Sequence, residues 1–292
     1  MNKKHVGDLT FDIVNYALLA LFAILCIFPF IYVLSYSITP YADYLKDPMN
    51  LIPRNATLSA YKKLLNFPLI YSGYKTTLFI TIIGTFINVF MLCISAYPLC
   101  KKDLKGRNVI LGFILFTMFF SGGMIPSYYL VRSLGLLNSP WALILPGAVS
   151  AYNLILMKNF IGTIPESLEE SAVIDGANEI IVLFRIIIPL SMPAIATFTL
   201  FHAVGHWNTF FGAVIYITKR NYWPLMLVLR EMVLEGGTGM VQEGVIDSPE
   251  QMVQPFTMKM AVIILTILPI IMVYPFVQKY FMKGMLLGSV KG

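Results

Sequence analysis

The stretch EESAVIDGANEIIVLFRIIIPLSMP, Glu169–Pro193, lies between two apolar segments that are each long enough to cross a membrane. Five of the fifteen carboxylates in the chain occur in or just before it, from Glu166 to Glu179. The loops that join hydrophobic segments are usually short, and on one side of the membrane they are basic. A long acidic insert that favours helix is therefore expected to lie outside the membrane and to meet another surface there.

The composition indicates a polytopic membrane protein. Of 292 residues, 58% are hydrophobic and 12% are charged, and the mean hydropathy is +0.75. Soluble domains carry roughly 25% charged residues, so lipid must cover part of this apolar surface. Cys26, Cys93 and Cys100 lie in or beside apolar segments, which favours small core residues over a disulfide framework or a metal site. The basic residues are scattered, which argues against a nucleic-acid partner.

The apolar segments predict an all-α integral membrane protein with six transmembrane helices in a single transmembrane domain, residues 1–292. Crossing the hydrocarbon core takes about 20 residues. The first apolar run is too long for a cleavable signal sequence. The predicted spans are 13–36, 76–99, 108–131, 141–161, 193–217 and 260–281.

Short loops set the predicted orientation. Lys101–Arg107 carries four cations and Arg132–Pro140 carries one, so the first of these loops is expected to be cytoplasmic. Both termini and the acidic insert then lie on the cytoplasmic side. Residues 37–75 and 218–259 form external loops, and the first of these contains a predicted helix near Leu58–Leu65.

The insert, residues 163–189, is predicted to form two short helices along the membrane face. Thr163 and Glu166 fit a capping box that starts the first helix, and Gly176 ends it. Asp175 is expected to cap a second helix that begins near Ala177 and reaches Pro189. The alternative is an interfacial helix without a protein partner, but such helices usually present cations to lipid.

The spacing of this insert resembles the EAA signature of ABC importer permeases. Glu170-Ser171-Ala172 is followed by three residues and Gly176, and then by nine residues and Ile186-x-Ile188-Pro189, with Ser171 in place of alanine and Ile188 in place of leucine. Within these permeases, the chain resembles the carbohydrate-uptake (maltose-type) class in its motifs DGA, PLxxP and GLLNSPWALILPG. Phe120–Ser139 and Asn221–Leu225 are similar to its branch for oligosaccharides and polysaccharide fragments, including those that carry uronic acids.

This resemblance implies a permease subunit of a binding-protein-dependent importer in the bacterial cytoplasmic membrane, not an enzyme, working by ATP-driven alternating access. It implies a second homologous permease, two cytoplasmic ABC ATPase subunits that hold ATP and Mg, and an extracytoplasmic solute-binding protein. This chain itself is expected to hold no cofactor or metal, and it has no P-loop motif. The residues implied in coupling to the ATPase are Glu169, Glu170, Ser171, Ala172, Asp175, Gly176, Ala177, Phe184 and Pro189.

Polar residues inside the predicted spans are candidates for the translocation path, because such groups usually face the protein interior or water. These candidates are Asn88, Tyr152, Asn153, His202, His206, Trp207 and Asn208, and Thr81 and Thr85 share the helix face of Asn88. Hydrogen bonding between helices alone is the alternative. His202 and His206 also have the spacing of two metal ligands, as in an intramembrane metalloenzyme, although Ala203 replaces the usual general base. The alternative that the chain belongs to an importer of a non-sugar solute also stays open.

Overall fold

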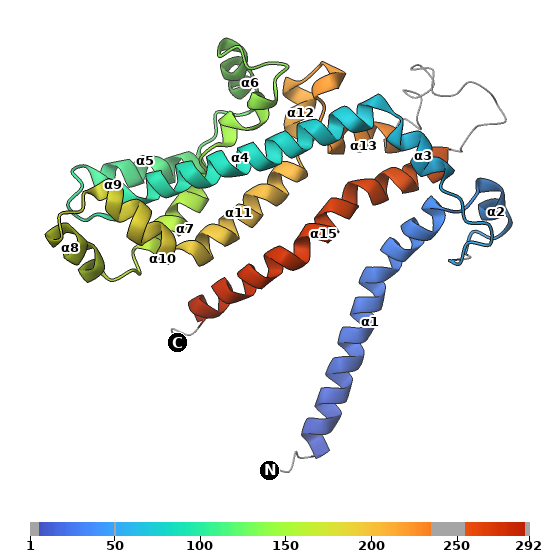
Figure 1. Ribbon diagram of the computed structural model, residues 1–292, viewed down its shortest axis with the longest axis horizontal. Coiled ribbons are helices and arrows are strands. Elements are labelled where there is room, and N and C mark those ends of the chain that lie inside the picture. The colour runs from blue at the N-terminus through green and yellow to red at the C-terminus, as the bar shows by residue number, and fades with distance from the viewer. Residues whose placement is uncertain (1–5, 50, 235–254, 290–292) are drawn as a thin grey trace. The chain divides into compact units, whose positions relative to one another are not determined.

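The computed structural model describes residues 6–49, 51–234 and 255–289, and within these ranges every regular element is a helix (Figure 1). The chain divides into two units. One contains the residues up to Pro68 together with Leu229–Pro269, and the other contains Leu69–Val228 and the residues from Ile270 onward. The single transmembrane domain stays a prediction, and each unit is described by itself.

The first unit begins with α1 (Val6–Ser37), a 32-residue helix that contains the predicted span 13–36. Its apolar side chains are largely exposed, which suits a helix surrounded by lipid. The segment that follows is fixed to its end, because the Ser35 hydroxyl donates to the carbonyl of Leu51 at 2.6 Å. This segment contains α2 (Tyr41–Lys46) and α3 (Ser59–Leu65), and α3 confirms the helix predicted near residues 58–65.

The second unit is built along α4 (Pro68–Cys100), whose 33 residues contain the predicted span 76–99. Its other elements follow in chain order: α5 (Arg107–Phe119), α6 (Met124–Ser133), η1 (Pro140–Leu143), η2 (Leu145–Gly147), α7 (Ala151–Ile161), α8 (Glu166–Ile174), α9 (Glu179–Val182), η3 (Leu183–Ile187), α10 (Ile188–Leu190), α11 (Met192–Trp207), α12 (Phe211–Tyr216) and η4 (Arg220–Tyr222). α13 (Leu225–Leu234) and α15 (Pro255–Ser289) each contribute residues to both units.

The main core of the second unit lies where the acidic insert meets the long helices. Buried side chains from α4, α7, η3 and α11 form one cluster that includes Leu92, Met157, Ile187 and Phe198. At the Cys100 end of α4 lie the short helices α8 and α9 (Figure 1), and α9 contributes the buried Val182 to this cluster. The insert is therefore seated on a packed base and is not a free loop.

Three helices in the described residues are long and apolar enough to cross a membrane: Phe11–Ser37, Pro68–Cys100 and Phe256–Pro275. The last lies in α15, which covers the predicted span 260–281. The number rises to six only if each of three bent helix pairs counts as one span. Six spans therefore stay a prediction.

Each of the other three predicted spans contains a break in the helix. Residues 108–131 are broken between α5 and α6, which meet at 115°, because Gly123 has a left-handed φ of 87° that a helix cannot contain. Residues 141–161 bend by 52° before α7. Residues 193–217 are divided between α11 and α12, and α11 itself meets the preceding helix at 80°.

Candidate functional site

The first helix of the insert, α8, begins at Glu166 as expected but without the predicted capping box. Its N-cap residue is Pro165, which has no side-chain cap. The Thr163 hydroxyl instead donates to the carbonyl of Phe160 at 2.7 Å, within the end of α7. Glu166 and Glu169 lie in the first turn of α8, where the helix dipole favours negative charge.

The end of α8 at Gly176 is confirmed, and its geometry shows why glycine is there. Gly176 has a φ of 87° and donates to the carbonyl of Val173 at 3.0 Å, and the next N–H, of Ala177, donates to Ala172 at 2.9 Å. This is a Schellman closure, which needs a left-handed residue after the helix. Asp175 therefore ends α8, and its predicted role as cap of the second helix was wrong.

Asn178 caps the second helix instead, because the Schellman closure occupies residues 175–177. Its Oδ1 accepts the N–H of Ile181 at 2.9 Å, and α9 begins at Glu179. The helix then widens into the π-turn Leu183–Ile187. Pro189 follows this turn and has no N–H to donate to the carbonyl of Arg185, which disfavours a regular α-helix at this point.

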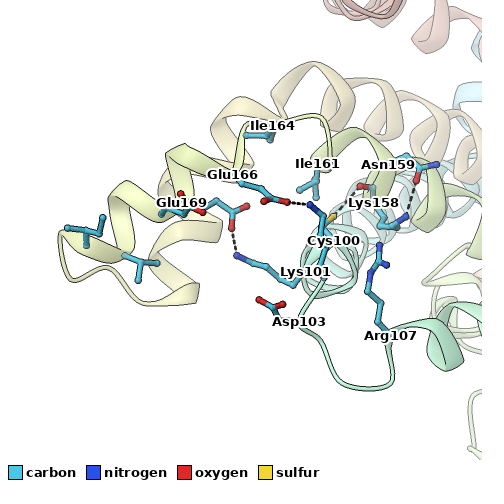
Figure 2. A pocket seen from close by; sticks show the side chains of 15 residues that line it. Cys100, Lys101, Asp103, Arg107, Lys158, Asn159, Ile161, Ile164, Glu166 and Glu169 are labelled. Carbon is cyan, nitrogen blue, oxygen red and sulfur yellow. Dashed lines mark hydrogen bonds and ion pairs between the residues drawn. The ribbon is translucent and has the colours of Figure 1, made fainter.

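Two lysines at the end of α4 pair with the carboxylates of the insert (Figure 2). The Lys101 ammonium contacts Glu169 directly and lies 3.4 Å from Oε2 of Glu179. Lys102 Nζ lies 2.7 Å from Oε1 of Glu166. Tyr97, in the core cluster, donates its hydroxyl proton to Glu179 Oε2 at 2.5 Å. We call these residues, Tyr97, Lys101, Lys102, Glu166, Glu169 and Glu179, the Lys101 cluster.

The electrostatics of the Lys101 cluster favour charged partners at neutral pH. The hydrogen bond from Lys102 lowers the pKa of Glu166 below its ordinary value, and the same bond raises the pKa of Lys102. Burial alone would lower the pKa of Lys101, but hydrogen bonds to Glu169 and Tyr97 outweigh it and raise that pKa. Glu166 therefore loses its pairing only in acid, and the two lysines lose theirs only in strong base.

An open cleft of about 890 Å³ lies beside this cluster, between α8, the end of α7 and the loop after α4 (Figure 2). Its lining includes Arg107 and Lys158 opposite Glu166, Glu169 and Glu170. Arg107 is itself fixed, since its Nε donates to the carbonyl of Leu99 at 2.8 Å. The site is thus an open cleft lined by charged side chains of both signs.

The remaining residues implied in coupling have different surroundings. Ala172 and Ala177 pack against the core cluster of their own chain. The Ser171 hydroxyl donates to the carbonyl of Ser167 at 2.8 Å, within α8. Phe184 in the π-turn is 47% exposed, and Glu170 is exposed as well.

Asn88 in α4 connects three elements of the second unit. Its Nδ2 donates to the carbonyls of Gly147 and Ala148 at 2.8 and 2.9 Å, in the break before α7. Its Oδ1 lies 2.7 Å from His206 Nε2 in α11. Because Oδ1 can only accept, His206 carries its proton on Nε2. Asn88 and His206 therefore form hydrogen bonds between helices, and their place in the translocation path stays a prediction.

The other path candidates are spread over several surroundings. Asn153 Nδ2 lies 3.3 Å from His202 Nε2, Trp207 is buried and Tyr152 is 59% exposed. The Asn208 amide donates to the carbonyl of Val204 in its own helix. Both histidines thus have amide partners at Nε2, and the described residues hold no group of three metal-ligating side chains.

Sequence reasoning missed Tyr97, Lys101, Lys102 and Gly84. The lysines served only to predict orientation, although a basic loop and a loop with five acids that are predicted on the same side of the membrane were a signal for pairing. Gly84 lies against the His206 ring, and a Cβ there would come within 2.6 Å of Nε2. Nothing in the sequence indicated that Gly84 lies against the ring of His206.

The chain resembles known proteins over nearly its whole length. The model of the family described as binding-protein-dependent transport system inner membrane component matches residues 1–286. The polygalacturonan/rhamnogalacturonan transport system permease protein YtcP of Bacillus subtilis (strain 168) is 46% identical over 97% of this chain and 98% of its own. Protein LplC of the same strain is also 46% identical, over 97% of this chain and 95% of its own.

Among solved structures, a similar chain occurs in the crystal structure of a bacterial ABC transporter involved in the import of the acidic polysaccharide alginate. It is 34% identical, with a TM-score of 0.86, and the match covers 96% of this chain and 100% of that one.

Proposed function

This chain belongs to the family of binding-protein-dependent transport system inner membrane components, and from that premise we propose that it forms half of the translocation path of an ABC importer for acidic oligosaccharides. It is a permease subunit and not an enzyme. The observation that carries the substrate class is the whole-length similarity to a polygalacturonan/rhamnogalacturonan permease and to a chain of an alginate importer. Polygalacturonan and alginate are both polymers of uronic acids.

The partners follow from the same premise. A second permease subunit completes the path, two ATPase subunits bind ATP and Mg in the cytoplasm, and a solute-binding protein delivers the sugar from outside. Both termini, the Lys101–Arg107 loop and the acidic insert lie in the cytoplasm. In support, the positive loop and the charged cleft lie together beside α8.

In this proposal α8 and α9 are the coupling element that receives the movement of the ATPase subunits. Closure of those subunits on ATP shifts the insert and rocks the spans between inward and outward openings. Glu170 and Phe184 present exposed side chains to the ATPase surface. Gly176 and the small residues around it keep the turn between the two helices tight.

The path residues then have two kinds of task. Asn88 and His206 hold α4, α7 and α11 together through the hydrogen bonds described above. Tyr152, a residue that is 59% exposed, offers an aromatic face to a passing sugar. His202, Asn153, Trp207 and Asn208 complete the wall of the path.

Purification from gently solubilised membranes, followed by uptake assays in proteoliposomes, tests this proposal. We expect an ABC ATPase and a second six-span permease to co-purify with this chain. With the solute-binding protein and internal ATP, oligogalacturonate should be taken up, while a neutral malto-oligosaccharide of the same length should not. The absence of an ATPase, or a preference for the neutral sugar, would contradict the importer or the acidic substrate, respectively.

A further inference from the structure

The insert is joined to α4 by contacts that chain order does not provide. α8 follows α7, and α9 leads through the π-turn into α11, so a force on the insert reaches α7 and α11 through the covalent chain. α4 ends much earlier in the sequence, at Cys100. Only side-chain contacts can transmit a force from the insert to it.

The insert packs on the core cluster that includes residues of α4, and the Lys101 cluster adds polar contacts to α4 from both helices of the insert. Glu169 belongs to α8 and Glu179 to α9, and both carboxylates face the Lys101 ammonium and the Tyr97 hydroxyl. The Lys101 ammonium also lies 4.7 Å from the centre of the Tyr97 ring. One lysine and one tyrosine at the end of α4 thus bind two helices at once.

The attraction between Lys101 and Glu169 is stronger than that of a surface ion pair, because both side chains are partly buried. The side chains of Lys101 and Glu169 are 32% and 18% exposed, whereas those of Lys102 and Glu166 are 77% and 70% exposed. Partial burial lowers the local dielectric constant and strengthens the attraction between charges. The outer pair is screened by solvent, but it holds the first residue of α8 and so restrains rotation of that helix.

We propose that the Lys101 cluster makes α8, α9 and the end of α4 a single rigid body. A movement imposed on the insert by the ATPase subunits then reaches the second predicted span directly, in addition to the chain neighbours α7 and α11. Tyr97, Lys101 and Lys102 are positioning residues for coupling in this scheme. The inference rests on the proposed function, because it needs an ATPase that moves the insert.

The carboxylates of α8 therefore have two different roles. Glu166 and Glu169 are bound to their own chain. Glu170 is exposed, and no described residue forms an ion pair with it. A change in the Lys101 cluster should therefore impair the transmission of movement, while the outer surface that receives the ATPase stays intact.

The decisive variant is Lys101→Glu in the complete importer, reconstituted with its solute-binding protein. We expect uptake to fall by about tenfold or more, since the new carboxylate would face Glu169 and Glu179 and repel both. The ATPase subunits should still co-purify and hydrolyse ATP. Lys105→Glu is the matched control, because it makes the same charge change in the same loop at an exposed residue outside the cluster.

Two further variants separate coupling from folding. Lys101→Glu combined with Glu169→Lys keeps three acids and two bases in the cluster, and we expect it to restore most of the uptake. Lys102→Glu changes only the exposed outer pair, so it should fold normally and lower uptake by about two- to threefold.

Each result decides the inference. If Lys101→Glu imports sugar as well as Lys105→Glu does, the cluster does not transmit movement. If Lys101→Glu loses its ATPase and the charge exchange restores nothing, the lysine serves folding or docking, and the inference is wrong. A wild-type complex that does not import would instead overturn the proposed function, which is measured first in the same assay.

Discussion

At the scale of single residues, Asn138 shows how one side chain fixes two loops of the second unit. It is the only non-glycine residue with positive φ in the described ranges, at 58°. Its Oδ1 accepts the N–H of Thr218 at 2.7 Å and that of Lys219 at 2.9 Å. Asparagine is among the few residues that tolerate this conformation and also offer a local acceptor.

Three substitutions separate the two properties of Asn138. Asn138→Ala loses both and should lower the free energy of unfolding by about 1–3 kcal/mol. Asn138→Gly keeps the backbone freedom but loses the acceptor, and Asn138→Asp keeps the acceptor, so both should cost less. Thermal unfolding of the purified protein in detergent measures the order. Equal stability of all four proteins would mean that these hydrogen bonds contribute nothing.

At the scale of helices, the contact between α4 and α11 depends on a glycine. A Cβ at Gly84 would lie 2.6 Å from Nε2 of His206, the atom that is bonded to Asn88. Gly84→Ala must therefore displace the imidazole and break that bond. We expect a loss of about 1–3 kcal/mol in the free energy of unfolding, as for other overpacked sites.

A double-mutant cycle tests this explanation. In a His206→Ala background the obstacle is gone, so Gly84→Ala should cost much less than in the wild type. Gly205→Ala in α11 is the control, because a Cβ there meets nothing within 4 Å. If Gly84→Ala costs the same with and without the imidazole, the histidine is not what limits the approach.

At the scale of the whole molecule, the proposed orientation places Lys105 and Lys219 on opposite sides of the membrane. Each can be changed to cysteine after Cys26, Cys93 and Cys100 are replaced by alanine. A membrane-impermeant maleimide added outside intact cells should label the cysteine at position 219 and leave the one at 105 unlabelled until the cells are opened. The reverse labelling pattern would show that the topology is inverted, so that the acidic insert lies on the side of the membrane away from the ATPase subunits.

The sequence by itself determined what depends on local chemistry. Hydropathy over about 20 residues marked the apolar segments, and the motif around Gly176 located the insert and the end of α8. These signals are local, because a left-handed turn or a lipid-facing helix is specified by the residues within it. Asp175 and Asn178 show the limit: both are good caps, and the closure of the preceding turn decided between them.

Only the tertiary structure decided which distant groups meet. Asn88 binds partners 59 and 118 residues away, and Lys101 binds Glu169 at a separation of 68 residues. No spacing rule relates such positions, because they are brought together by packing of whole helices. The breaks between α5 and α6 and before α7 are of the same kind. Glycine and proline permit a bend in a helix, and contacts elsewhere in the fold set its angle.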